Sequence, residues 1–360
     1  MKIDIKIIDP EQFNIVPRDI GGELCHLVCA KNITTKWNKD NMFLRSVMVN
    51  SSGAPINCGW PKFYNLGEHP ELYPDPKTFK DWVVDNKEDG SLICVSRYNG
   101  EHIIRTRGSI GFEGMESSHE IADYLSQHPA ITDNEWVNGE GYTLLFEYLS
   151  PTNVIVLRHS IVEFVLIGVI ENETYRILTH AEVDIIAEKI GIRRPERYTF
   201  DTIEDIVSNC AILRDREGYV LSYNNNQNRV KLKGSAYLSL HRFKEHATLE
   251  NTIDLYFAYG QPDYQTFEKK LTEAFDYECF SMVRSYASQI CDASKEMAAL
   301  IQAMREKVEP LRNMARKDAA AVILQAYGQT NRASFAFKML DFKPLGSEDL
   351  VKLIYQLLKK

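Results

Sequence analysis

The pattern of hydrophobic residues changes once along the chain, close to residue 240. From about residue 43 up to that point, short runs of β-branched and aromatic residues are separated by turn sequences such as Tyr-Asn-Gly and Asn-Asn-Asn, which is typical of antiparallel hairpins. After Tyr237, hydrophobic residues recur at helical spacing over 264–274, 278–316 and 347–358. The sequence therefore predicts an α+β protein, with a sheet-rich domain over residues 1–243 and an all-helical domain over residues 244–360.

Two helical patterns interrupt the runs that predict strands. We expect helices over 180–190 and 202–213, the second opened by Asp201 as a cap. The runs expected to form strands or hairpins are FLRSVMV, SLICVSRYNGEHIIRTRGS, TLLFEYL, NVIVLR, FVLIGVI and GYVLSYNNNQNRVKLK. Because the chain has no long Gly/Ser or Pro linker, we expect a short, ordered connection between the domains.

Length and composition exclude several classes of protein. At 360 residues with 44% hydrophobic content, the chain can form two domains of ordinary globular composition. The longest strongly apolar stretch, 164–170, is far shorter than the ~20 residues of a membrane-spanning helix, so no membrane association is predicted. The N-terminus lacks a signal-peptide core, and the seven scattered cysteines contain no CxxC pair. These features predict a cytoplasmic protein, in the host cytoplasm if the chain is viral.

The charge distribution argues against a protein that coats nucleic acid. The net charge is −8, so binding by bulk attraction is not expected. One local stretch, 229–244, nevertheless carries five Lys or Arg and no carboxylate. Such a stretch can hold phosphate groups.

The segment DNKEDGSLICVS places Lys87 at a turn before a clear strand. A lysine attacks phosphorus only as the neutral amine, which requires its pKa to be lowered by burial or by neighbouring cations. Gly90 would let the backbone approach a nucleotide closely. K-x-D-G is too short to identify a site by itself, because an ordinary surface hairpin explains it equally well.

Other segments follow in a fixed order around this motif and resemble one family. They are LRSVMV with Arg45, PKFYNLGE with Lys62 and Tyr64, TRGSI with Arg107, FEYLSPTNVIVL with Glu147, EGYV with Glu217, and VKLKGSAYLSLH with Lys231 and Lys233. With KEDGS, they resemble the ATP-dependent RNA ligases of the bacteriophage RNA ligase 1 family, in the covalent nucleotidyltransferase superfamily. The resemblance covers roughly residues 45–241, and FEYLSPTN and KxKxxxYLSLH are its most specific parts. It implies an N-terminal nucleotidyltransferase domain of the ATP-grasp-like ligase adenylation fold, with antiparallel sheets and flanking helices.

Local patterns around several of these residues agree with the resemblance. In VKLKG, Lys231 and Lys233 share one face of a strand and would face one phosphate, whereas a solvated edge strand is the alternative. Glu147 shares a face with Leu145 and Leu149, so the carboxylate needs a partner, either a ribose hydroxyl or a structural salt bridge. Arg45 in FLRSVMV poses the same problem, with a nucleotide phosphate or a structural pair as its partner.

The remaining roles are implied by the resemblance alone. It implies that Lys87 accepts AMP, that Lys231 and Lys233 act with it, and that Glu217 helps to position Mg²⁺ or Mn²⁺ through the phosphates or their waters. The residues that it places at the nucleotide are Arg45, Lys62, Tyr64, Asp89, Gly90, Arg107, Glu147, Glu217 and Tyr237. Arg107 stands where the family commonly has lysine, and Tyr237 is equally explained as a packed tyrosine. Tyr64 is a candidate stacking surface for a base, with packing in an aromatic core as the alternative.

The function expected from the resemblance is ATP-dependent RNA ligation. Lys87 would attack ATP to give lysyl-AMP, the AMP would pass to an RNA 5′-phosphate, and a 3′-hydroxyl would then displace it. One alternative is a DNA ligase or an mRNA capping enzyme, although both usually carry an OB fold where this chain predicts helices. Another is a catalytically idle RNA-binding protein with the same fold.

The sequence says less about the substrate and the partners than about the reaction. Family members include enzymes that repair cleaved tRNA anticodon loops, so nicked tRNA is a candidate substrate. The chain has no GxxxxGK[ST] phosphate loop, which implies that a separate kinase-phosphatase prepares the RNA ends. In the helical domain, a candidate RNA surface consists of Arg305, Lys307, Arg312, Arg316 and Lys317, with a solvated helix face as the alternative.

Overall fold

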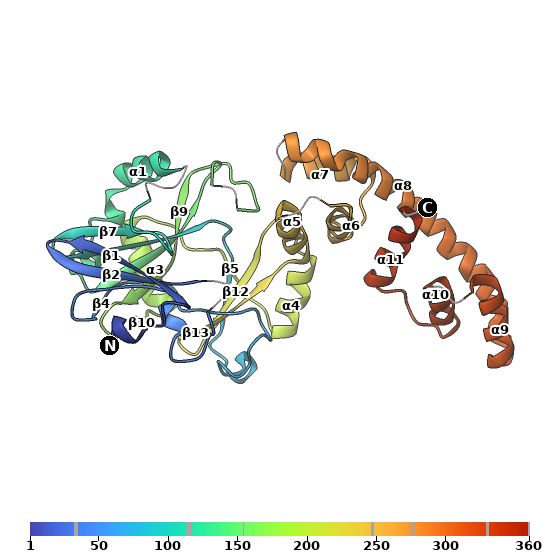
Figure 1. Cartoon of the computed structure of the whole chain (residues 1–360), viewed down its shortest axis with the longest axis horizontal. Helices are drawn as coiled ribbons and strands as arrows, with labels where there is room; N and C mark the ends of the chain where they lie inside the picture. Colours follow the sequence, from blue (N-terminus) through green and yellow to red (C-terminus); the bar gives the residue numbers. More distant parts are fainter. Residues whose placement is uncertain are drawn as a thin grey trace. The chain divides into compact units, whose positions relative to one another are not determined.

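The structure of the chain is a computed structural model that describes residues 1–31, 35–112, 117–153, 155–245, 248–274, 277–328 and 331–358. The chain divides into two units, Met1–Tyr237 and Leu238–Lys360 (Figure 1). The first contains three antiparallel sheets with flanking helices, and the described part of the second consists of helices and their connections. The α+β class is therefore confirmed. The domain boundary between residues 243 and 244 stays a prediction.

Within the described residues, thirteen strands form the three sheets of the first unit. One sheet has the order β1 (Phe13–Ile20), β2 (Glu23–Ala30), β3 (Ser46–Val49), β4 (Pro55–Cys58). The central sheet has the order β10 (Arg176–Ile177), β9 (Glu163–Glu171), β8 (Tyr142–Leu149), β6 (Ser91–Tyr98), β7 (Glu101–Arg105). The third has the order β11 (Arg197–Tyr198), β5 (Val83–Asn86), β12 (Gly218–Tyr223), β13 (Asn228–Lys233).

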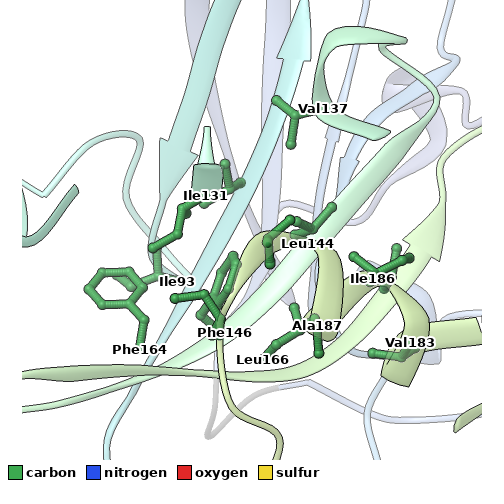
Figure 2. Close-up of a cluster of buried hydrophobic side chains, with 14 of the residues drawn as sticks. Ile93, Ile131, Val137, Leu144, Phe146, Phe164, Leu166, Val183, Ile186 and Ala187 are labelled. Atoms are coloured by element: carbon green, nitrogen blue, oxygen red, sulfur yellow. The ribbon is translucent and has the colours of Figure 1, made fainter. Parts of the chain in front are cut away.

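One face of the central sheet packs against helices. Alternate residues of β6, β8 and β9, among them Ile93, Phe146 and Phe164, form a buried cluster with side chains from the helices (Figure 2). The helices on this face are α1 (Ser118–Gln127), α2 (Glu135–Asn138) and α3 (His180–Ile190). Helix α3 begins with a capping box between Thr179 and Glu182, which satisfies backbone N–H groups of its first turn.

The other face of the central sheet packs against the β1–β4 sheet. Cys94, Leu145 and Ile170 from the central sheet contact a cluster that includes Val28 and Val47. Trp60 belongs to the same cluster, and a Cβ at Gly168 would lie 2.3 Å from its ring, so only glycine fits there. Two sheets and a helical layer therefore enclose the core of the first unit.

The third sheet has one apolar face and one face toward a cavity. Val84, Leu221, Val230 and Leu232 pack with helix α4 (Ile203–Ile212) on the apolar face. Because side chains alternate along a strand, Lys231 and Lys233 lie on the opposite face, as the VKLKG pattern predicts. The Asn-Gly and Asn-Asn-Asn turns predicted from the sequence join β6 to β7 and β12 to β13, with residues at positive φ in both.

The second unit is organised around the long helix α8 (Tyr277–Val308), which packs against α6, α7, α10 and α11. These helices are α6 (Leu249–Ala258), α7 (Tyr264–Ala274), α10 (Asn331–Leu340) and α11 (Ser347–Leu358). Helix α9 (Arg316–Tyr327) packs against α10, and α5 (Ser235–Glu245) precedes them all in sequence. The short 3-10 segments of the chain are η1 (Ile5–Ile7), η2 (Met42–Arg45), η3 (Pro76–Thr78), η4 (Pro129–Ile131) and η5 (Glu309–Asn313). In the described ranges, no helix is both long enough and apolar enough to span a bilayer.

Several predicted elements match the structure and others do not. The helices over 180–190, 264–274 and 347–358 are confirmed. The helix predicted over 278–316 is wrong as a single element: α8 ends at Val308 and a 3-10 segment follows, because Pro310 lacks the N–H that a continuing helix needs. Helix α4 is capped by Thr202 and not by Asp201.

Two predicted strands are also corrected. In FLRSVMV, the 3-10 segment η2 precedes the short strand β3, so Arg45 does not lie on a strand. In NVIVLR, residues 155–157 form bends and residue 158 has no assigned secondary structure, so the described part of this run is not a strand. There, the backbone N–H groups of Val156 and Leu157 donate to the Asp89 carboxylate and are unavailable for a ladder.

Candidate active site

Lys87 directly follows strand β5 and points toward the start of β12. Its backbone N–H donates to the Gly218 carbonyl at 2.9 Å, which extends the pairing of the two strands by one residue. Its ammonium Nζ lies 2.7 Å from Glu217 Oε2. The antiparallel register therefore places the lysine of KEDGS beside the glutamate of EGYV, although 130 residues separate them in sequence.

Glu217 is shared by two lysines. Lys233 pairs with Gly218 across β12 and β13, and its Nζ lies 2.9 Å from Glu217 Oε1. The Glu217 side chain is 2% exposed, whereas those of Lys87 and Lys233 are 21% and 22% exposed. A buried carboxylate needs such partners, because an unpaired charge is costly away from water.

The charges around Lys87 keep it protonated in the ligand-free chain. Burial alone would lower the pKa of Lys87, but the carboxylates of Glu217 and Glu147 outweigh it and raise this pKa above its ordinary value. Lys231 behaves in the opposite way: burial, reinforced by the charges of Lys233 and Lys87, lowers its pKa to about 8. A neutral Lys87 amine therefore requires the balance of charge around it to change.

Glu147 lies on β8, next to the loop that carries Lys87. Burial raises the pKa of Glu147 to about 7, although the Lys87 ammonium opposes the shift. Its Oε1 accepts a hydrogen bond from the Gly90 backbone N–H at 3.2 Å. A Cβ at Gly90 would lie 2.3 Å from the Tyr148 carbonyl oxygen. The close packing of the loop against β8 is therefore a sufficient reason for glycine at this position, without a nucleotide.

Asp89 makes its contacts within the protein. Its carboxylate accepts hydrogen bonds from the backbone of Val156 and Leu157, at 2.9 and 2.6 Å, and from the Tyr237 hydroxyl at 2.7 Å. The side chain is almost completely buried. Lys233 lies over the Tyr237 ring, with its Nζ 5.0 Å from the ring centroid. Asp89 and Tyr237 therefore hold the loop of residues 87–90, the 155–157 segment and β13 together.

The motif FEYLSPTN is also tied to its surroundings. Glu120 on α1 accepts hydrogen bonds from the hydroxyls of Tyr148, Ser150 and Thr152. The Asn153 amide donates to Ser91 Oγ at 3.0 Å, at the start of β6. These contacts give a structural reason for the polar residues of the motif.

A cavity of about 740 Å³ opens beside these residues. Among the predicted site residues, Arg45, Lys87, Gly90, Arg107 and Glu147 line it. Its walls also include residues that sequence reasoning missed, among them Trp60, Asp85, Thr106, Ser109, His180 and Arg229. The volume is within the range of pockets that hold small molecules.

Cationic side chains lie near the aromatic rings of the neighbouring residues Phe63 and Tyr64. The guanidinium of Arg45 and the ammonium of Lys231 each lie 5.8 Å from the Phe63 ring centroid. Lys62 Nζ lies 4.7 Å from the ring centroid of Tyr64. Burial, reinforced by the charge of Arg45, lowers the pKa of Lys62. Tyr64 itself is 8% exposed, so its ring is used in packing and is not an open stacking surface for a base.

The missed residues Asp85, His180 and Arg229 form one polar group in the cavity wall. Asp85 Oδ1 accepts from Arg197 Nε at 3.3 Å, and its Oδ2 lies 3.5 Å from His180 Nδ1. Burial lowers the pKa of Arg229 to about 9, and its guanidinium lies 3.4 Å from the Trp60 ring centroid. The two-residue spacing of Arg229, Lys231 and Lys233 in RVKLK is the signal that could have identified Arg229.

The carboxylates of the site do not form a preformed metal cage. Within the described residues, no group of three or more His, Cys, Asp or Glu side chains is placed to hold a metal ion. Glu217 could supply one carboxylate, provided that its lysine contacts are loosened.

The fold and site define a class of protein. A lysine beside buried carboxylates, with a row of cations along one cavity, is the arrangement of a covalent nucleotidyltransferase. The model of the RNA ligase family matches residues 44–247, more than half of the chain, and the chain belongs to this family.

Individual relatives are distant. A candidate RNA ligase from Thermovibrio ammonificans is 25% identical over 179 residues, which is 49% of this chain and 46% of the relative. A candidate bifunctional polynucleotide kinase/RNA ligase from Autographa californica nuclear polyhedrosis virus is 26% identical over 227 residues, which is 56% of this chain and 31% of the relative. The chain thus spans less than half the length of these curated relatives.

Solved structures of RNA ligases have a lower sequence identity to this chain than the curated relatives have. An archaeal ATP-dependent RNA ligase has 15% identity and a TM-score of 0.43, covering 76% of this chain and 72% of its own. An RNA ligase from Naegleria gruberi, solved with AMP and manganese, has 16% identity and a TM-score of 0.42, covering 51% and 58%. The family assignment rests on the family model.

Proposed function

We propose that the chain is an ATP-dependent RNA ligase that joins a 5′-phosphate and a 3′-hydroxyl through lysyl-AMP and adenylylated RNA. The observation that carries the proposal is Lys87 at the cavity, 2.7 Å from the buried Glu217 that also binds Lys233. A nucleophile, its charge partner and a second cation thus meet where a phosphate would sit. The membership of the RNA ligase family supports the same chemistry.

In the first step, Lys87 Nζ attacks the α-phosphorus of ATP. A P–N bond forms, the bond to the bridging oxygen breaks, and pyrophosphate leaves with that electron pair. The amine must first lose a proton, and Glu217 accepts a hydrogen bond from it at 2.7 Å. Lys231, Lys233, Arg45 and Arg107 would stabilise the negative charge on the phosphates. Lys62 would extend this set toward the rim.

The later steps exchange the AMP. An oxygen of the RNA 5′-phosphate attacks the phosphorus of lysyl-AMP, which breaks the P–N bond and frees Lys87. The 3′-hydroxyl of a second end then attacks the RNA phosphorus, so that a phosphodiester forms and AMP leaves. The Glu147 carboxyl, next to Gly90 in the cavity wall, is placed to receive a ribose hydroxyl.

Mg²⁺ or Mn²⁺ fits this site only as an ion held mainly by the nucleotide. With no cluster of three ligating side chains among the described residues, Glu217 would be the main protein carboxylate near it. When bound, the metal neutralises phosphate charge and, by the same charge, favours the neutral form of Lys87. The Naegleria gruberi ligase solved with ATP and manganese supports this choice of cofactors.

RNA repair is the proposed setting, with nicked tRNA as a candidate substrate. The viral relative is named as a kinase and a ligase in one protein, which supports a kinase-phosphatase acting beside this chain. In the second unit, part of the predicted basic surface is already neutralised, since Arg312 pairs with Glu309 and Arg316 with Asp341. The role of that unit in RNA selection stays a prediction.

The test is the intact mass of the protein after incubation with magnesium and ATP or GTP. We expect a gain of one AMP with ATP in the wild type and none in Lys87→Ala. Lys189→Ala is the matched control, because Lys189 is exposed and its surface contacts are with Glu135 and the Trp136 ring, away from the cavity residues. Adenylation of Lys87→Ala would exclude the mechanism, and a gain with GTP would favour a capping enzyme.

A second assay separates ligase classes. Purified protein is given RNA or DNA strands with a 5′-phosphate and a 3′-hydroxyl, and RNA with a 5′-hydroxyl as the unhealed control. We expect sealing of the phosphorylated RNA alone. Preferential sealing of DNA would favour a DNA ligase, and a wild type that neither carries nor gains AMP would favour the idle RNA-binding protein.

A further inference from the structure

Two cations of the cavity wall lie on segments that no strand pairing connects in the described part of the chain. Arg45 ends η2, directly before β3 in the β1–β4 sheet. Arg107 lies in the 106–109 turn that follows β7 at the edge of the central sheet, and all four residues of this turn line the cavity. Backbone ladders fix neither segment relative to the other, so side chains must do so.

Arg105, the last residue of β7, makes this connection. It is 0% exposed, and its Nε donates to Asn57 Oδ1 at 2.7 Å. Its Nη1 donates to Ser46 Oγ and the Thr106 carbonyl, at 2.6 and 2.9 Å. Its Nη2 donates to the carbonyls of Ser46 and Asn57, at 3.3 and 3.1 Å. These contacts satisfy all five N–H groups of the guanidinium.

Every acceptor of Arg105 is uncharged. In the described part of the chain, no carboxylate forms an ion pair with it. A fully buried charge without a counter-charge is costly, and an apolar side chain of similar volume is often as stable or more stable in such a place. Stability alone therefore gives a weak reason for an arginine here.

Two of the residues that accept hydrogen bonds from Arg105 are sequence neighbours of the cavity cations Arg45 and Arg107. Ser46 follows Arg45, and Thr106 precedes Arg107. The Ser46 hydroxyl, which accepts from Arg105, also donates to the Arg107 carbonyl at 2.7 Å. One guanidinium thus joins the backbone beside Arg45 to the backbone beside Arg107.

We propose that Arg105 is a positioning residue that holds Arg45 and Arg107 at one wall of the cavity, where together they bind the phosphate chain of a nucleoside triphosphate. The proposal rests on the proposed function and adds a residue that never touches the nucleotide. Lysine could not replace Arg105 in this role. Its three donors are on a single nitrogen atom, so it cannot reach both Ser46 and Asn57 as the planar guanidinium does.

The test uses tripolyphosphate, whose binding to the full-length protein can be measured by calorimetry without any catalysis. We expect Arg105→Met to weaken binding about tenfold, which is the size expected for losing one charge-assisted hydrogen bond, and Arg105→Lys to weaken it less. Arg107→Ala should show a similar loss. Because part of the effect of Arg105 passes through Arg107, the double variant Arg105→Met/Arg107→Ala should lose less than the sum of the two single losses.

A stability control separates positioning from general damage. Ile103→Val truncates a buried residue of the same strand, and it should lower the melting temperature while leaving tripolyphosphate affinity unchanged. Affinity of Arg105→Met within twofold of wild type would overturn the proposal, as would additive losses in the double variant. If Arg105→Met does not fold, wild-type affinity in Arg105→Lys overturns it. A wild type that binds tripolyphosphate in this pattern but never gains AMP would refute the proposed function alone.

Discussion

Replacing Glu217 by glutamine should destabilise the first unit strongly, although the side chain keeps its shape. The change removes the carboxylate shared by Lys87 and Lys233, which is 2% exposed. Breaking a buried ion pair costs ~3–5 kcal/mol, because the remaining charge is left without a partner. The two lysines are about one-fifth exposed, so we expect the lower end of this range, about 3 kcal/mol.

A surface pair of the same length provides the control. Lys189 Nζ lies 2.8 Å from Glu135 Oε1, but the side chains are 58% and 63% exposed. Glu135→Gln should therefore change stability by less than about 0.5 kcal/mol. In a unit of this size, 3 kcal/mol corresponds to a fall in melting temperature of roughly 6–12 °C. Calorimetric melts of both variants at pH 7 measure the difference.

The pH dependence tests the cause. In the wild type, the pKa of Lys87 is raised, so its contribution to stability is present below the ordinary lysine pKa and is lost as the pH rises through the raised value. Glu217→Gln removes the largest charge that opposes the effect of burial, so the pKa of Lys87 should be lower than in the wild type and the ammonium should lose its proton more easily. The deficit relative to wild type should shrink between pH 7 and pH 10. Equal melting temperatures for the Glu217 and Glu135 variants, or a deficit that grows with pH, would refute the reasoning.

Three other substitutions have defined outcomes. Burial raises the pKa of Glu147 to about 7, against an ordinary 4.5, so the folded wild type should lose about 3 kcal/mol of stability as the pH rises through this interval. Glu147→Gln cannot titrate, so the difference between melts at pH 5 and pH 8 should become smaller in this variant. Gly90→Ala places a Cβ 2.3 Å from a backbone oxygen of β8 and should lower the free energy of unfolding by about 1–3 kcal/mol, measured by denaturant titration. Gly141→Ala is the control, because the nearest atom to its Cβ is 3.9 Å away, and it should leave the free energy of unfolding nearly unchanged. Phe342 has φ 57° and is 76% exposed, so Phe342→Gly should relieve strain of about 1 kcal/mol and lose about 0.5 kcal/mol of contact with Arg312. A lower melting temperature for that glycine variant would contradict this balance.

Local patterns predicted the elements that depend on neighbouring residues. The helix His180–Ile190 follows from hydrophobic residues at three-to-four spacing, and its bounds match the structure. The turn at Asn99 and Gly100 follows from two residues that tolerate positive φ. Similarly, the alternation in VKLKG placed both lysines on one face of β13.

Local patterns failed where a distant group decides the structure. The run NVIVLR looks like a strand, but Asp89 takes the backbone N–H groups of Val156 and Leu157, 67 and 68 residues away. Arg45 looks like a residue in a strand, but it ends a 3-10 segment. No local pattern distinguishes these cases from the strands that were predicted correctly.

The sequence by itself determined the α+β order of the chain, the bounds of the helices over 180–190, 264–274 and 347–358, the hairpin turns and the motifs that place it among RNA ligases, because each depends on residues close together in the chain. Only the tertiary structure decided that Glu217 binds Lys87 and Lys233 at once, and that Arg105 is buried against Ser46 and Asn57. These contacts join different strands and sheets. Their energies depend on burial and on the register between segments, which hydrophobic periodicity within one segment does not contain.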